Sequence, residues 1–327
     1  MADTLSNTPP VLQFGWIGLG SMGHAMAKNV HAYLQSQSGT SLSFYNRTAS
    51  RGDDLEQLGG KRCASVAELA ACSNAIFISA SDDTAVQSII EQIISSGSVL
   101  AGKIIVDTTT IHPNTTKEIS QKLQARGAHF AAMPVFGATP VAEQGKLLAV
   151  FAGPEDVYEM IAPVLKGVLA REVLLVGKEP EKATLLKTTG NFVTAGLMEI
   201  IAEAHVFAEK TGLSSAHLEK LLALNFGTVA HSISTRMTTG VYIPGNGETP
   251  WSDLNLALKD VGHGVDSAKQ AGVSLKVGNT ALEHLERAKM YSEKNGKRPL
   301  DSSSLYGIVR QDSGLDFRTD YVQKRDQ

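Results

Sequence analysis

The sequence predicts an α/β protein in which a doubly wound parallel sheet is followed by an all-helical region. Short apolar runs alternate with helical patterns from residue 11 to about 177, which is typical of a parallel sheet covered by helices. After Gly177 no further strand alternation recurs, and the helical patterns become longer. Near the N-terminus, one apolar run leads through three spaced glycines into a helix.

The composition is that of a globular protein with one or two domains. The 327 residues are 43% hydrophobic, and a net charge of −3 does not favour a polyanion as partner. No apolar run reaches the roughly 20 residues that cross a bilayer. Residues 1–10 have neither a basic residue nor an apolar core, so we expect a disordered lead-in without a secretory or mitochondrial address. With only two cysteines, Cys63 and Cys72, we expect a cytoplasmic protein.

The first strand, expected over residues 11–17, runs into glycines at G-x-G-x-x-G spacing. The first glycine permits a tight turn, the second lets a pyrophosphate approach the backbone, and the third allows close helix–strand packing. The N-terminus of the next helix offers N–H groups to phosphates. A purely structural turn is the alternative. We expect a Rossmann-type dinucleotide site formed by Gly18, Leu19, Gly20, Ser21, Met22 and Gly23.

The second strand, over residues 42–45, is followed by Asn46, Arg47 and Thr48. NAD-binding versions of this fold carry an acidic residue here, which binds the ribose 2′-hydroxyl and would repel a 2′-phosphate. Arg47 instead offers a forked set of charged donors to a phosphate, Thr48 adds a hydroxyl, and Arg51 lies one helical turn further on. The sequence therefore favours NADP as the cofactor, with a solvated surface arginine as the alternative.

Later loops offer further contacts to the cofactor. Ser81 follows a strand expected at residues 75–79 and stands before Asp82 and Asp83, one of which caps a helix. Thr108 follows the next strand. Because loops at the carboxyl ends of parallel strands lie over the cofactor, we expect Ser81 and Thr108 to bind it, although threonines there cap helices equally well. The other strands are expected at residues 103–107, 127–133, 147–153 and 173–176.

We expect a dinucleotide-binding domain over residues 11–180 and an all-helical domain over residues 181–311. The second begins with a long helix at 181–210, which spans the junction and has Gly212 as its C-cap. Residues 312–327 are polar and predict a loosely held tail. Further helices are expected at residues 214–224, 254–270 and 276–295.

Lys187 and Asn191 lie four residues apart on the long helix and therefore share one face. Because the rest of that face is small or apolar, the charged lysine would be desolvated and its pKa would fall toward neutrality. This property suits a general acid that protonates a developing alkoxide during hydride transfer. A lysine that extends to the surface is the alternative.

Five motifs in one order resemble the β-hydroxyacid dehydrogenase family, which includes 3-hydroxyisobutyrate dehydrogenase, tartronate semialdehyde reductase and the glyoxylate/succinic semialdehyde reductases. More distant relatives are 6-phosphogluconate dehydrogenase and the imine reductases. The resemblance implies hydride transfer between NADP(H) and a β-hydroxy acid or alcohol, or the matching aldehyde or ketone. It also implies a helical domain that binds substrate and forms a homodimer or homotetramer. The motifs are Gly-Trp-Ile-Gly-Leu-Gly-Ser-Met-Gly (15–23), Asp-Thr-Thr-Thr-Ile-His-Pro (107–113), Pro-Val-Phe-Gly (134–137), Lys-Thr-Thr-Gly-Asn (187–191) and Asp-Leu-Asn-Leu-Ala-Leu-Lys-Asp (253–260).

By this resemblance, Lys187 is the general acid/base, and Asn191 orients it and binds substrate. Thr109 takes the place of the substrate-contacting serine in the family's D-x-S-T motif. Lys259 reaches a substrate carboxylate or the edge of the cofactor, and Asp260 packs or caps nearby.

The substrate loop, expected as a turn over residues 134–140, departs from the family pattern D-x-P-V-S-G-G. Ala132, Phe136 and Ala138 replace the Asp, the Ser and the second Gly, whereas Gly137 matches. Phe136 removes a hydroxyl and fills space. We therefore expect Phe136 and Gly137 to contact a larger or less polar carbonyl substrate, or one whose carboxylate binds at Lys259.

Two alternative functions remain. Imine reductases usually replace the catalytic lysine by Asp or Tyr, so Lys187 favours carbonyl over imine reduction. A non-catalytic NADP-binding interaction protein is the other alternative, against which Lys187, Asn191 and Lys259 argue. His231 is a candidate substrate contact, although lone histidines are usually structural or surface groups. No metal-ligand spacing is present, and hydride transfer to NADP needs no metal.

Overall fold

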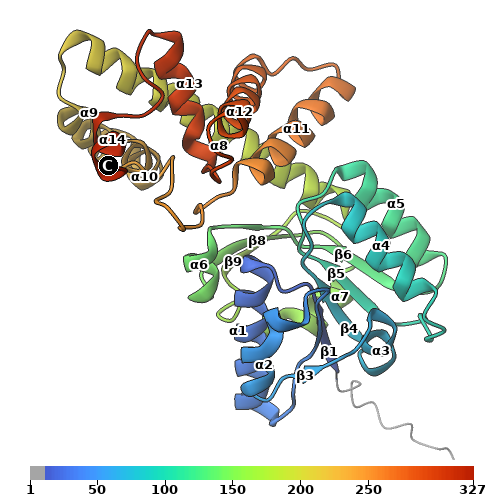
Figure 1. Cartoon of the computed structure of the whole chain (residues 1–327). Coiled ribbons are helices and arrows are strands. Elements are labelled where there is room, and N and C mark those ends of the chain that lie inside the picture. Colours follow the sequence, from blue (N-terminus) through green and yellow to red (C-terminus); the bar gives the residue numbers. More distant parts are fainter. Residues whose placement is uncertain (1–11) are drawn as a thin grey trace, which may run out of the picture. The chain divides into compact units, whose positions relative to one another are not determined.

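The computed structural model describes residues 12–327, and the lead-in expected at residues 1–10 lies outside them. The chain divides into two compact units between Thr184 and Leu185 (Figure 1). We call them the sheet unit, which ends at Thr184, and the helical unit, which begins at Leu185. The division falls within helix α8 (Glu181–Thr211).

The sheet unit is built on six parallel strands in the order β3-β2-β1-β4-β5-β6. Because this order reverses between β1 and β4, the carboxyl ends of these two strands form the point at which such sheets bind ligands. The prediction of a doubly wound parallel sheet is confirmed. The strands are β1 (Phe14–Ile17), β2 (Ser43–Tyr45), β3 (Lys61–Arg62), β4 (Ala75–Ile78), β5 (Ile104–Asp107) and β6 (His129–Ala132).

Helices cover both faces of this sheet (Figure 1), because successive side chains of each strand point to opposite faces. Trp16 and Phe77 stack with ring centroids 5.3 Å apart and pack in the same core as helix α1. Ile17 and Ile76 pack in the opposite core with helices α3, α4 and α5. The helices of this unit are α1 (Ser21–Ser38), α2 (Asp53–Gln57), α3 (Val66–Cys72), α4 (Asp83–Ile94), α5 (Pro113–Gln124), α6 (Thr139–Glu143) and α7 (Glu155–Ile161).

A second sheet of three strands follows the parallel one and contains β7 (Val135–Phe136), β8 (Leu147–Phe151) and β9 (Ala170–Leu175). β7 runs antiparallel to β8, whereas β8 and β9 are parallel. The prediction of one parallel sheet up to residue 177 is therefore wrong here, and so is the turn over the whole of residues 134–140. Pro134 and Gly137 confine β7 to two residues, which are too few for a strand pattern to appear in the sequence.

Within residues 12–327, no helix is long and apolar enough to cross a membrane. Cys63 and Cys72 are free thiols, with their Sγ atoms 3.8 Å apart. The cytoplasmic location stays a prediction from the composition.

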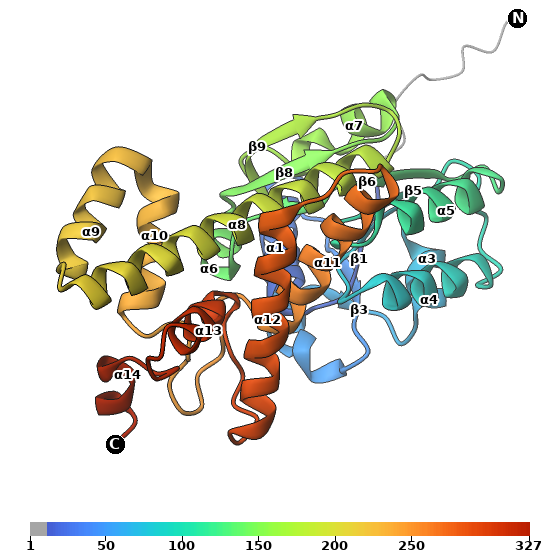
Figure 2. The ribbon, with the colours of Figure 1, turned by 90° about the horizontal axis from the view of Figure 1, so that it is seen from above.

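The helical unit contains the rest of α8 and six further helices, and Figure 2 shows α9 and α10 at the C-terminal end of α8. The predicted ranges of α8, α11 and α12 agree with the structure to within one residue. A π-helical segment, Leu222–Phe226, ends the helix predicted at 214–224, and α10, α13 and α14 were not predicted. The helices are α9 (Ser215–Leu221), α10 (Gly227–Thr238), α11 (Leu254–Gln270), α12 (Lys276–Lys294), α13 (Leu305–Asp312) and α14 (Asp320–Arg325).

Glycines let α11 and α12 pack closely against α8. A Cβ atom at Gly264 of α11 would lie 3.0 Å from the carbonyl oxygen of Thr188. A Cβ atom at Gly278 of α12 would lie 2.9 Å from the ring of Phe192. Because any larger residue would separate the helices, these contacts fix the position of α11 beside the part of α8 that carries Lys187.

The tail predicted at residues 312–327 is packed onto the helical unit. Phe317 and Val322 are buried, and the hydroxyl of Tyr242 donates to the carbonyl oxygen of Phe317 over 3.0 Å. The prediction of a loose tail is wrong because it rested on the many polar residues and overlooked two apolar side chains that anchor the segment in the core.

Candidate functional site

The glycine turn between β1 and α1 is held against the neighbouring strands by its backbone. Gly18 has a φ of +98°, which favours glycine, and its N–H donates to the carbonyl oxygen of Tyr45 over 2.9 Å. A Cβ atom at Gly23 would lie 2.3 Å from the carbonyl oxygen of Gly18, so a glycine is needed for α1 to begin this close to β1. Gly18 and Gly23 therefore fix the position of the first turn of α1.

Gly20 has a different environment, because a Cβ atom built there would meet no atom within 4 Å outside its chain neighbours. It is the N-cap of α1; no side chain of the described residues caps this end, and the first turn has no acidic residue. The first N–H groups of α1 and the helix dipole therefore favour an anion at this end. A dinucleotide pyrophosphate fits this turn.

The loop after β2 is braced against the glycine turn by Asn46. Its Oδ1 accepts a hydrogen bond from the N–H of Leu19, and its Nδ2 donates to the carbonyl oxygen of Thr48, each over 2.8 Å. The sequence did not indicate this bracing role. The side chains of Arg47 and Thr48, which follow Asn46, are exposed.

The residues predicted to contact the cofactor after β4 and β5 have partners within the sheet unit. The hydroxyl of Thr108 donates to the last carbonyl oxygen of β4 over 2.8 Å, and that of Thr109 accepts from a backbone N–H just beyond β4 over 3.0 Å. The hydroxyl of Ser81 donates to Asp82, whose other carboxylate oxygen caps α4. Thr108 and Thr109 are buried and brace the loops, whereas Ser81 is exposed.

Phe136 and Gly137 lie at the end of β7. The side chain of Phe136 is partly buried against Ala132, Val150 and Ala152, so an apolar surface stands where the family pattern has a serine. Gly137 has a φ of +132°, and the loop therefore depends on a glycine at this position.

In the helical unit, α8 and α11 bring Lys187, Asn191, Lys259 and Asp260 together. Asp260 Oδ2 accepts a hydrogen bond from Asn191 Nδ2 over 2.9 Å, and its Oδ1 lies 2.9 Å from Lys259 Nζ. Lys187 is buried, with 8% of its surface exposed. Burial lowers the pKa of Lys187 to about 8, the charge of Asp260 opposes this shift, and the charge of Lys259 adds to it.

This group has the properties of a proton donor near neutral pH. A lysine with a pKa of about 8 is still mostly protonated at pH 7, yet it gives up its proton far more readily than an ordinary exposed lysine. Asn191 lies on the same face of α8, and Asp260 fixes the orientation of its amide. By the family resemblance, Asp260 was expected to pack or cap nearby. Its hydrogen bond with Asn191 and its ion pair with Lys259 show that it also organises the group.

One predicted substrate contact, His231, belongs neither to the glycine turn and its neighbouring loops nor to the group around Lys187. His231 is half-buried on α10. Among residues 12–327, no three His, Cys, Asp or Glu side chains are grouped so that they could hold a metal ion.

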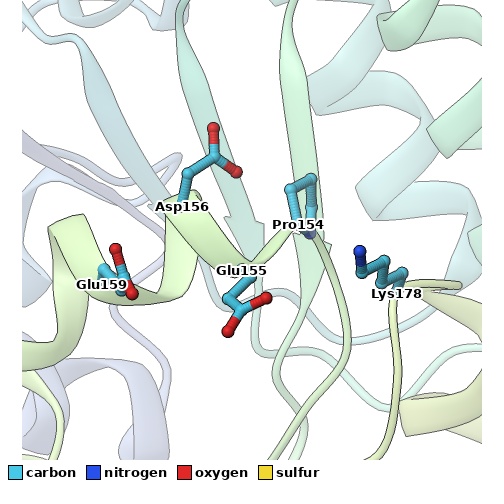
Figure 3. Close-up of a pocket in the computed structure, with 5 residues that line it drawn as sticks. All are labelled: Pro154, Glu155, Asp156, Glu159 and Lys178. Atoms are coloured by element: carbon cyan, nitrogen blue, oxygen red, sulfur yellow. The ribbon is translucent and has the colours of Figure 1, made fainter.

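The hollow in Figure 3 lies at the start of α7 and contains no residue of the predicted site. Its lining is mostly acidic, which does not suit a phosphate-bearing ligand. It is lined by Pro154, Glu155, Asp156, Glu159 and Lys178.

Two family models match most of the chain. The NAD binding domain of 6-phosphogluconate dehydrogenase matches residues 13–177, and the NAD-binding domain of NADP-dependent 3-hydroxyisobutyrate dehydrogenase matches residues 182–308. The NADH-dependent oxidoreductase ucdB of Aspergillus ustus is 33% identical over 91% of this chain and 99% of that protein. The chain belongs to the β-hydroxyacid dehydrogenase family. It is an oxidoreductase with a nicotinamide dinucleotide as cofactor.

Another relative and two solved structures are also similar to this chain. Glyoxylate/succinic semialdehyde reductase 1 of Arabidopsis thaliana is 30% identical over 91% of this chain and 99% of that protein. The structure of Mycobacterium tuberculosis 3-hydroxyisobutyrate dehydrogenase with L-serine has a TM-score of 0.76 at 21% identity, over 92% of this chain and 100% of that chain. A reductive aminase from Aspergillus terreus has a TM-score of 0.56 at 23% identity, with the same coverage. Both structures share the fold.

The different environments of Gly20 and Gly23 lead to a paired prediction. Gly23→Ala should lower the free energy of unfolding by about 1–3 kcal/mol, because its Cβ collides with backbone. Gly20→Ala should leave thermal unfolding unchanged and weaken dinucleotide binding about tenfold or more, because its Cβ occupies the space of the pyrophosphate. Thermal unfolding and fluorescence titration with NADPH measure both effects. A Gly20→Ala protein that binds NADPH as tightly as the wild type would contradict this position for the pyrophosphate.

Proposed function

We propose that this protein is an NADP-dependent reductase or dehydrogenase that interconverts a β-hydroxy acid, or a related alcohol, with its aldehyde or ketone. The buried Lys187, with its pKa near 8 and its neighbours Asn191 and Asp260, is the observation that carries this proposal. The cofactor, when bound, supplies or accepts the hydride at the carbon of the substrate.

The residues of the helical unit handle the proton in this scheme. During reduction, Lys187 Nζ donates a proton to the substrate oxygen as the carbonyl carbon receives hydride, and the neutral amine that remains is favoured by burial. During oxidation, the neutral amine takes the proton from the alcohol. The charge of Asp260 keeps enough Lys187 protonated at neutral pH, and Asn191 offers its amide to the substrate oxygen.

The substrate is proposed to be a carbonyl compound that is larger or less polar than a small hydroxy acid. Phe136 supports this, because it presents a partly buried apolar ring instead of a hydroxyl. A substrate carboxylate would then bind at Lys259, because the group contains two lysines, Lys187 and Lys259, and one carboxylate, Asp260. Semialdehydes are the first compounds to test, because the Arabidopsis thaliana relative is a glyoxylate/succinic semialdehyde reductase by name.

The preference for NADP over NAD is also a proposal. It is supported by the exposed side chains of Arg47 and Thr48 at the end of β2 and by Asn46 at the position where NAD-binding proteins carry an acidic residue. The relatives differ, since ucdB is NADH-dependent by name and one matching family model is named for an NADP-dependent enzyme. Arg47 is the feature of this chain that favours the phosphorylated cofactor.

Replacement of Lys187 tests the catalytic proposal. Lys187→Met should lower kcat for aldehyde reduction about 10²- to 10⁴-fold, because the proton donor is lost, while the Kd for NADPH stays within about twofold. Lys210→Met, which removes an exposed lysine from the end of the same helix, should have no effect. NADPH absorbance with glyoxylate, succinic semialdehyde and a cyclic imine measures the rates.

Full activity of Lys187→Met on aldehydes would contradict the mechanism. A wild-type protein that reduces the imine but neither aldehyde would identify an imine reductase instead. Absence of turnover with every compound would favour a non-catalytic NADP-binding interaction protein.

We further propose that the protein is a homodimer whose interface includes α8. Leu186, Val193, Ile200 and Phe207 repeat every seven residues, and between 37% and 69% of each side chain is exposed. Such a stripe on a long helix is typical of helix–helix association. Ile200→Asp with Phe207→Asp should halve the mass measured by light scattering, whereas Val99→Asp in the sheet unit should not. A wild-type mass equal to one chain would contradict the proposal.

A further inference from the structure

Arg62, the last residue of β3, joins several segments around the loop that follows β2. Its Nη1 donates to the carbonyl oxygen of Ala49, and its Nη2 lies 2.7 Å from Asp53 Oδ1 and 2.9 Å from Glu56 Oε2. Its Nε donates to the same oxygen of Glu56 over 3.0 Å. The guanidinium also lies over the ring of Phe44, the residue with which Arg62 pairs in the sheet. The network is therefore anchored to β2.

The segment held by this network begins with the residues proposed to bind the 2′-phosphate. Thr48 is the N-cap of the short helix η1 (Ala49–Gly52), and Asn46 ties the start of the segment to the glycine turn. Arg62 holds the segment one residue after Thr48, at Ala49. The side chains of Arg47 and Arg51 are exposed along this stretch.

Helix α2 follows this segment directly and brings three carboxylates close to it. Asp54 is paired with His24 and Lys28, at 2.7 and 3.2 Å, whereas Asp53 and Glu56 are paired with Arg62. Residues 47–62 contain four basic and three acidic side chains, and Arg62 is the basic residue that is paired with two of the three carboxylates. A 2′-phosphate carries nearly two negative charges and is repelled by uncompensated carboxylates.

We propose that Arg62 is a positioning residue for the choice of cofactor. It acts through Asp53 and Glu56, whose charges it neutralises, so that Arg47 and Arg51 present a positive field to the 2′-phosphate. Arg62 itself is assigned no contact with the cofactor. The inference rests on the proposed preference for NADP.

Direct titration of the protein with NADPH and with NADH, followed by cofactor fluorescence, tests this role without turnover. Arg62→Gln should raise the Kd for NADPH about fivefold and change the Kd for NADH less than about twofold, because NADH lacks the 2′-phosphate. The difference between the effects of Arg62→Gln on the Kd for NADPH and on the Kd for NADH should shrink at about 0.5 M salt, since exposed charges are screened. A merely structural role would weaken the binding of both cofactors equally.

Matched variants separate charge from folding. Asp53→Asn with Glu56→Gln, added to Arg62→Gln, should restore the ratio of the two Kd values, and the same pair with Arg62 intact should tighten NADPH binding. Lys61→Gln removes an equal charge from the same strand, leaves the network in place, and should change the ratio less than about twofold. Equal losses for NADPH and NADH in Arg62→Gln, or no rescue by the added pair, would overturn the proposal.

The same titrations also test the proposed preference for NADP independently of Arg62. Arg47→Asp, which alters the proposed phosphate ligand itself, should weaken NADPH binding more than Arg62→Gln does. A wild-type protein that binds NADH more tightly than NADPH would overturn the proposed preference. The role of Arg62 would still be decided by how much Arg62→Gln changes the ratio of the Kd values for NADPH and NADH from that of the wild type.

Discussion

The close approach of the first turn of α1 to the strand ends is the constraint on which the sheet unit depends. A side chain at Gly23 would meet the carbonyl oxygen of Gly18 at 2.3 Å and the hydroxyl of Ser79 at 2.8 Å, so nothing larger fits. Because the helix is fixed there, its free N–H groups open toward the space at Gly20. The packing that stabilises the unit and the anion site are thus two consequences of one contact.

In the helical unit, a balance between burial and charge gives Lys187 its chemistry. Burial alone favours the neutral amine, which has no proton to donate. The charge of Asp260 opposes this effect and that of Lys259 reinforces it, while Asn191 and Lys259 hold the two oxygens of Asp260 in place. The contact between α8 and α11 at Gly264 maintains these distances. A glycine that packs against Thr188, the neighbour of Lys187 in the chain, therefore matters for the pKa of the proposed proton donor.

The sequence predicted those parts of the fold and site that local patterns encode. The glycine spacing, the pairing of Lys187 with Asn191 on one face, and the range of α11 all follow from periodicity within a few turns. The two-residue strand β7 and the packed tail were missed because their order comes from distant contacts, such as that of Tyr242 with Phe317. The bracing by Asn46 and the network of Arg62 were missed for the same reason. Each depends on the pairing of β2 with a neighbouring strand.

The pH dependence of kcat/KM for aldehyde reduction, measured for the wild type and for Asp260→Asn, tests most directly whether buried Lys187 is the proton donor. In the wild type we expect kcat/KM to fall as the pH rises through about 8, because only protonated Lys187 donates. In Asp260→Asn the fall should occur at lower pH, since the loss of the negative charge lowers the pKa of Lys187 further. A fall at the same pH in both proteins, or at higher pH in the variant, would contradict this role for Lys187.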